Sequence, residues 1–135
     1  MDGAVELVRL GSAGNGVVLR ITAAEGAGEP LTGVLVVDTP FVSGRLDVRV
    51  LAEDLREWQE ALDALDSGQD EDRRAFSHGA SLLVERDAAA ELARVTVEDT
   101  STPPTSVTVT VPMDDTWFDD AYERLEHAWK TWPLS

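Results

Sequence analysis

The acidic residues are the side chains of this chain that could most readily bind a metal or catalyse a reaction, but their spacing matches no metal-binding motif. The run from Asp66 to Asp72 contains four carboxylates. An EF-hand calcium loop needs oxygen ligands at fixed alternate positions, a Gly at the sixth position and a Glu at the twelfth. The run lacks that register, so we interpret it as a solvated loop. The adjacent acid pairs at 114–115 and 119–120 are no more informative, because paired carboxylates catalyse acid–base chemistry only where their surroundings separate their pKa values.

The residue types that most catalytic motifs require are scarce. The chain has no cysteine, which removes disulfides, thiolate nucleophiles and thiolate metal ligands. The two histidines, His78 and His127, belong to no HExxH or HxH pattern. The glycine-rich segment 11–16 lacks the lysine and the following helix of a phosphate-binding loop. We therefore expect no enzyme activity, no cofactor and no metal, with a site assembled from distant residues as the alternative.

The distribution of charge gives the clearest functional indication. The net charge is −15 and the isoelectric point is near 4.2. This balance argues against a nucleic acid or an anionic membrane as partner, since phosphate contacts need a basic footprint. The segment 53–72 carries a net −8 and the segment 114–127 a net −5, which leaves −2 for the rest of the chain. Such acidic surfaces either attract a basic protein or are simply solvated.

Two amphipathic helices are predicted to position most of these acids. The first, 51–68, has an apolar stripe with spacings of three and four: Leu55, Trp58, Leu62 and Leu65. The second, 116–131, has an apolar residue at every fourth position: Trp117, Ala121, Leu125 and Trp129. Thr116 with Asp119 resembles a capping box at its start. The aromatic residues are expected in the core, with Phe118 and Trp132 the two most open to solvent.

Strands are predicted on both sides of the first helix. Those before it are 4–10, 17–23, 31–38 and 45–50, and those after it are 81–86, 92–98 and 106–111, with a short strand near Phe76. The segment 31–38 is apolar on both faces, which indicates a central strand covered at least partly on both sides. Short connections favour antiparallel pairing, and two apolar helix stripes need one apolar sheet face. We therefore predict a single α+β domain over 1–135, with an antiparallel sheet of about seven strands and two helices on one face.

The chain shows no internal repeat, no membrane-length apolar run and no secretory signal, so we expect a cytoplasmic protein. Three stretches resemble a group of small acidic actinobacterial proteins known only as a domain of unknown function: 41–69 (FVSGRLDVRVLAEDLREWQEALDALDSGQ), 95–112 (VTVEDTSTPPTSVTVTVP) and 114–129 (DDTWFDDAYERLEHAW). The resemblance implies no activity and no site residues. The layout is also loosely similar to some bacterial toxin-immunity proteins.

The favoured hypothesis is a non-enzymatic protein-interaction domain whose partner is unknown, with a basic protein as the candidate partner class. The predicted partner-binding residues are acids of the first helix and of the segment after it: Glu57, Glu60, Asp63, Asp66, Asp70, Glu71 and Asp72. A narrower version is an immunity or inhibitor protein that neutralises a basic toxin or nuclease. The alternatives are a small-ligand-binding protein or enzyme with a pocket between sheet and helices, and a homo-oligomer that uses a Thr-rich sheet face.

Overall fold

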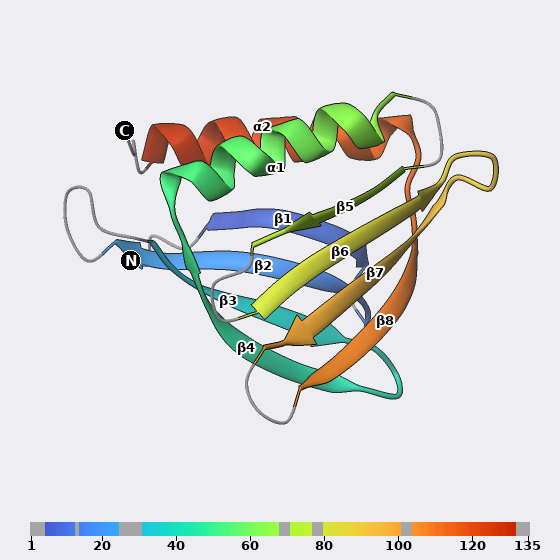
Figure 1. Ribbon diagram of the computed structural model, residues 1–135, viewed down its shortest axis with the longest axis horizontal. Coiled ribbons are helices and arrows are strands. Elements are labelled where there is room, and N and C mark those ends of the chain that lie inside the picture. Colours follow the sequence, from blue (N-terminus) through green and yellow to red (C-terminus); the bar gives the residue numbers. More distant parts are fainter. Residues whose placement is uncertain are drawn as a thin grey trace.

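The computed structural model describes residues 5–12, 14–24, 31–67, 71–76, 80–100 and 104–131. Within them, eight strands and two helices follow in an order that repeats itself (Figure 1). The first half consists of β1 (Val5–Ser12), β2 (Asn15–Ala24), β3 (Leu31–Asp38), β4 (Ser43–Val50) and α1 (Ala52–Leu65). The second half consists of β5 (Glu71–Ala75), β6 (Ala80–Asp87), β7 (Leu92–Asp99), β8 (Thr105–Pro112) and α2 (Asp115–Thr131). The repetition lies in the element order, although the sequence shows no repeat.

The strands form two antiparallel sheets of four, each in simple sequential order. The first sheet is β1-β2-β3-β4 and the second sheet is β5-β6-β7-β8. The α+β class and the antiparallel pairing are thus confirmed, but a single sheet of about seven strands is not found. The additional strand is β5, whose sequence EDRRA was expected to be part of an acidic loop. It pairs instead with β6 as the edge strand of the second sheet.

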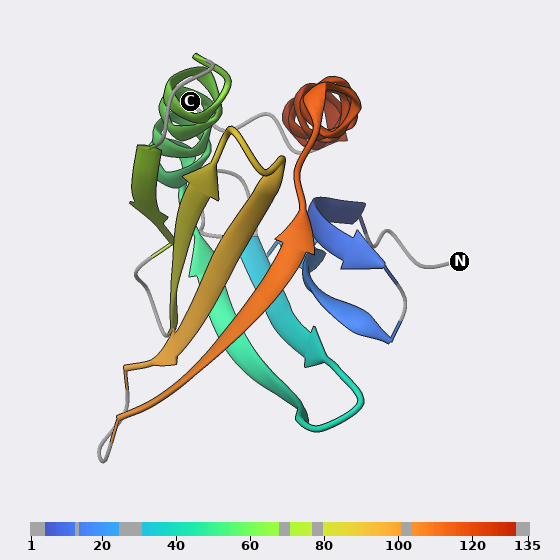
Figure 2. The same cartoon turned by 90° about the vertical axis from the view of Figure 1, so that its right-hand side faces the viewer.

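The two helices lie side by side, and each packs on the half of the chain to which it does not belong (Figures 1 and 2). Helix α1 of the first half packs along β5 of the second half, and α2 of the second half packs along β1 of the first. They therefore run along the first strands of the two sheets, where we expected them on one face of a single sheet. Neither helix of the described part combines the length and apolar character that a membrane crossing requires.

One hydrophobic cluster contains the inward side chains of both sheets and the apolar sides of both helices. In β3, burial alternates: Leu31, Leu35 and Val37 are buried, whereas Val34 and Val36 are half-exposed on the other face. One face of this strand is therefore fully covered and the other only partly, within the expectation of at least partial cover on both sides. An antiparallel sheet can bury one face and leave the other partly open to solvent, and β3 does so despite its apolar composition.

The buried face of α1 is the one that the sequence predicts, whereas the buried face of α2 is rotated about the helix axis from the predicted one. The whole predicted stripe of α1 is buried, and Trp58, 1% exposed, lies with its ring centre 5.5 Å from that of Phe76. In α2 the buried side chains are Phe118, Ala121, Leu125 and Ala128, whereas Trp117 and Trp129 are only partly buried at the flanks. Phe118, expected in the core but near its solvent-facing limit, is fully buried.

Two further aromatic expectations concern residues outside the helices. Phe41 was expected in the core, but it is 94% exposed at the tip of the β3–β4 hairpin. The tip is ordered by Thr39, whose hydroxyl accepts hydrogen bonds from the backbone N–H groups of Phe41 and Val42 at 3.2 and 2.8 Å. Trp132 lies outside the described residues.

The helix starts are capped by acids. The Asp114 carboxylate accepts the Trp117 N–H at 3.1 Å and the Thr116 hydroxyl at 2.7 Å. These hydrogen bonds, the one from Thr116 being the stronger influence, lower the pKa of Asp114, whose charge also suits the positive end of the helix dipole. Asp114 therefore caps α2 in place of the expected Thr116. At α1, the carboxylate of buried Asp54 accepts the Leu51 N–H at 2.8 Å.

A buried cation, Arg86 of β6, joins the end of α1 to the start of α2. Its Nη1 donates to the Leu65 carbonyl at 2.6 Å, and its guanidinium carbon lies 4.8 Å from the centre of the Phe118 ring. Its Nη2 is 4.0 Å from the exposed Asp115 carboxylate. The last turn of α1 has no basic residue of its own, so Arg86 supplies positive charge at the negative end of that helix dipole.

Candidate functional site

The contact between α1 and α2 gathers the acids of two distant segments into one layer. We call this the acidic layer and define it by its exposed residues: Glu53, Glu57, Glu60, Asp63, Asp66, Asp115, Asp119, Asp120, Glu123 and Glu126. Residues 52–66 hold six acids and one Arg, and residues 114–131 hold six acids, one Arg and one Lys. The eight strands hold nine acids and eight Arg. The negative charge is therefore concentrated in the helices, and the strands are nearly neutral.

A direct hydrogen bond holds the two helices of the acidic layer together. The Tyr122 hydroxyl of α2 donates to the Asp63 carboxylate of α1 at 2.6 Å. Burial, and then this hydrogen bond, raise the pKa of Tyr122 because both disfavour its ionised form. Asp63 is thus partly committed to the contact between the helices, which makes it a weaker candidate for a partner than its neighbours.

The structure separates the seven predicted partner-binding residues. Glu57 and Glu60 are exposed on α1 and Asp66 is exposed at its C-cap. Asp70 lies outside the described residues, and Glu71 is the first residue of β5. Asp72 is exposed on the outer face of the second sheet, beside Glu85 of β6. Glu57, Glu60, Asp63 and Asp66 remain together on α1 and its C-cap, whereas Asp72 belongs to a different surface.

Sequence reasoning left the exposed acids of α2 out of the site. Asp119, Asp120, Glu123 and Glu126 share the acidic layer with those of α1. The charge of segment 114–127 was a visible signal, but it did not place this segment beside 53–66. Only the tertiary contact between helices about sixty residues apart gives that information.

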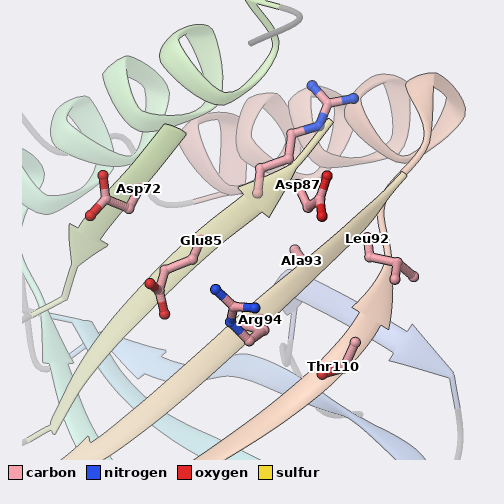
Figure 3. Close-up of a pocket in the computed structure, with 8 residues that line it drawn as sticks. Asp72, Glu85, Asp87, Leu92, Ala93, Arg94 and Thr110 are labelled. Atoms are coloured by element: carbon pink, nitrogen blue, oxygen red, sulfur yellow. The ribbon is translucent and has the colours of Figure 1, made fainter. Parts of the chain in front are cut away.

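A hollow of about 370 Å³ lies on the outer face of the second sheet (Figure 3). Its lining includes Asp72, Glu85 and Arg94, which the strand register places side by side on β5, β6 and β7. Asp87 and Thr110 are also exposed there. No group of three or more His, Asp or Glu residues in the described ranges could hold a metal ion. The hollow lies on the solvent side of the sheet and not between sheet and helices, where a ligand pocket was expected.

An ion network around Glu6 fixes α2 to β1. The Glu6 carboxylate lies 3.1 Å from Arg9, 3.3 Å from Arg20 and 3.5 Å from Arg124. Arg124 also bonds Asp120 at 2.7 Å and the Glu6 carbonyl at 3.2 Å. Burial opposes the ionisation of Glu6, but the hydrogen bonds from Arg9 and Arg20 outweigh it and lower the pKa of this carboxyl.

A second hollow, of about 400 Å³, lies beside this network between β1 and α2. His127 lines it and is exposed on α2, in line with its expected place on the polar flank of the helix. The other histidine, His78, lies outside the described residues. Three of the charged groups around this hollow belong to the network: Arg124 pairs with Glu6 across the contact between α2 and β1 and with Asp120 within α2. Their arrangement accounts for the attachment of the helix without a ligand.

Comparison with known proteins places the chain in a family but gives it no function. No curated protein and no solved structure matches it. A family model described as a family of unknown function (DUF5959) matches residues 5–133, which is nearly the whole chain. The chain therefore belongs to this family of unknown function.

Proposed function

We propose that the protein is a non-enzymatic interaction module that binds a basic protein through the acidic layer. The observation that carries this proposal is the position of the charge. Twelve acids and three basic residues lie in the two adjacent helical segments 52–66 and 114–131, whereas the strands are nearly neutral. An acidic surface on one side of a molecule attracts a basic partner and orients it before contact.

The rigidity of the acidic layer supports the proposal further. Both helices are anchored in the core by large side chains, Trp58 on α1 and Phe118 on α2. The Tyr122–Asp63 hydrogen bond fixes the helices to each other. The helices that carry the exposed acids are thus already in place, so a partner need not order the backbone of this surface on binding. A narrower version is the inhibition of a basic toxin or nuclease, because a basic cleft that binds nucleic acid would complement this surface.

The test compares charge reversals on the two helices with a matched reversal on the first sheet. One variant carries Glu57→Lys with Glu60→Lys, and a second carries Asp119→Lys with Glu123→Lys. The control carries Asp38→Lys with Asp47→Lys, which changes the net charge equally at exposed positions of β3 and β4. The wild-type protein, immobilised at low salt, captures partners from an extract, and the captured protein is then purified for binding measurements.

We expect the purified partner to be basic and to bind more weakly as salt increases. Each helix variant should weaken binding about tenfold or more, because like charges face each other across the contact. The control should bind as the wild type does. Equal loss in all three variants would reflect net charge alone and would contradict a specific surface, as would a partner whose affinity is insensitive to either helix reversal.

A further inference from the structure

The outer edge of β8 is covered at one end and open at the other. In the described residues β8 pairs with β7 alone. Near its C-terminal end, the Asn15 side chain donates to the Thr110 carbonyl at 3.4 Å. A Cβ atom at Gly11 would lie 2.9 Å from the Val111 side chain, so the β1–β2 hairpin covers this end closely. No described strand pairs with the other end, from Thr105 to Val109.

The direction of the backbone groups along this edge follows from the register. Met113 N–H donates to the Glu91 carbonyl at 2.9 Å, which makes these two residues a hydrogen-bonded pair. Hydrogen-bonded and non-hydrogen-bonded pairs alternate along an antiparallel ladder. The N–H and C=O groups of Ser106 and Thr108 therefore point away from β7.

Two other contacts agree with this assignment. The Thr96 and Thr108 hydroxyls are 2.8 Å apart, as expected where the side chains of a non-hydrogen-bonded pair approach each other closely. The Thr110 carbonyl, two residues from Thr108, accepts from Asn15 on the side away from β7. Ser106 and Thr108 consequently offer two N–H and two C=O groups to an additional strand.

This open edge is the least charged strand surface of the protein. The strand TSVTVTVP has no charged residue, although the chain carries a net −15. The corresponding edge strand of the first half, β4, carries Arg45, Asp47 and Arg49. Charged side chains on edge strands normally prevent pairing with another sheet, and β8 lacks that protection.

We propose that β8 pairs with β8 of a second copy of this chain, antiparallel and centred on Val107. In that register Ser106 of one copy lies opposite Thr108 of the second copy, and four backbone hydrogen bonds join the two edges. A second copy fits this edge because two molecules of charge −15 can approach closely only where both are uncharged. The two second sheets then become one continuous eight-stranded sheet.

The antiparallel arrangement also keeps the acidic layers apart. Helix α2 begins directly after β8, so each acidic layer lies beyond the C-terminal end of its own strand. Six residues from Val107 to Met113 span about 20 Å, and the two layers extend in opposite directions from the axis. Their separation exceeds the Debye length of about 8 Å at physiological salt, so their mutual repulsion is screened.

Sedimentation equilibrium of the purified chain tests the proposal at protein concentrations up to about 1 mM, where millimolar affinities are still detectable. We expect a reversible monomer–dimer equilibrium that salt strengthens, because salt screens the repulsion between two acidic molecules. This salt dependence is opposite to that expected for the basic partner of the acidic layer, so the two proposals fail independently. A chain that remains monomeric over this range overturns the proposal.

A proline substitution identifies the surface. Ser106→Pro removes an N–H that points away from β7, so it spares the β7–β8 ladder while deleting two of the four intermolecular hydrogen bonds. We expect it to raise the dimer dissociation constant about tenfold or more. Ser106→Ala, which keeps the N–H, should dimerise as the wild type does. A folded Ser106→Pro protein that still dimerises with unchanged affinity overturns the proposal.

If the proline variant fails to fold, a charge substitution tests whether the β8 edge forms the dimer contact. Thr108→Glu places two carboxylates close to the axis of the dimer, whereas Thr96→Glu on β7 adds the same charge one strand farther from the axis in each copy. The carboxylates of the second variant are about 10 Å farther apart. Thr108→Glu should therefore weaken the dimer more than Thr96→Glu. Equal effects overturn the proposal, since they would show that net charge and not the β8 edge controls association.

Discussion

The two halves of the molecule share one element order, but their first strands differ. Strand β1 has eight residues and buries four of them, including Leu7 and Leu10, whereas β5 has five residues, EDRRA. Strand β1 contacts β2, β8 and α2, and β5 is an edge strand that pairs with β6 and packs along α1. One position in the fold therefore accepts an apolar or a highly charged sequence, according to how many neighbours cover it.

The exchange of helices between the halves predicts a large loss of stability for Trp58→Ala. Trp58 belongs to the first half and packs against Phe76 of the second, so its removal leaves a cavity where the halves meet. We expect the free energy of unfolding in chemical denaturation to fall by about 3–5 kcal/mol. Trp58→Phe is the control, since Trp58 Nε1 has no hydrogen-bond partner among the described residues. A loss below about 1 kcal/mol in Trp58→Ala would show that the side chain is not a core anchor.

Arg86 is the polar counterpart of this contact, and its effect should be intermediate. Arg86→Met keeps an apolar stem but leaves the Leu65 carbonyl without its donor and removes the cation from the Phe118 ring. We expect the protein to lose about 1–3 kcal/mol of unfolding free energy. Asp115→Asn should change stability by less than about 0.5 kcal/mol, because this carboxylate is exposed and 4.0 Å away. Replacing a buried ion by an apolar group can also stabilise a protein. If Arg86→Met is more stable than the wild type, Arg86 does not stabilise the fold.

The smallest of the three contributions between the halves is expected at Glu6, where α2 of the second half meets β1 of the first. Its pKa in the folded protein lies below the ordinary value of 4.5, so its stabilising contribution is present above pH 4.5 and is lost as the pH falls through the folded-state pKa. Glu6→Gln should be less stable than the wild type at neutral pH, by under about 1 kcal/mol.

The difference between wild type and Glu6→Gln should disappear as the pH falls below 4.5. Thermal unfolding of both proteins across this range measures it. A difference that stays constant with pH would mean that the ionisation of Glu6 does not stabilise the contact between α2 and β1.

The elements that could be predicted from the sequence are those with one buried face, because their apolar residues then recur at a regular spacing. Helix α1 and strands β4 and β8 follow this rule, and their apolar spacing located them closely. Strand β5 could not be recognised, because an edge strand beside a helix needs few apolar residues. The face of α2 was also ambiguous. Trp117 and Phe118 are neighbours on the helix, and the rotation that buries Phe118 depends on the packing of Arg86 and the core.

The candidate site was predictable in charge and not in arrangement. Counting acids identified both acidic segments, and helical periodicity indicated which of their residues face solvent. No local pattern specifies that α1 and α2 touch, since the contact depends on each helix packing along the first strand of the other half. Asp72 was grouped with the acids of α1 because it is near them in sequence, but the β5 pairing places it on another surface.

The packing of α2 along β1 has a consequence for synthesis of the protein. Among the described elements, β1 is synthesised first and α2, the helix that covers it, is synthesised last. Because ribosomes add about 5–20 residues each second, α2 is synthesised several seconds or more after β1. The apolar side of β1 has no helix to cover it during this time. The contact between β1 and α2, which joins the first and last described elements, can therefore form only after all the other described elements have been synthesised.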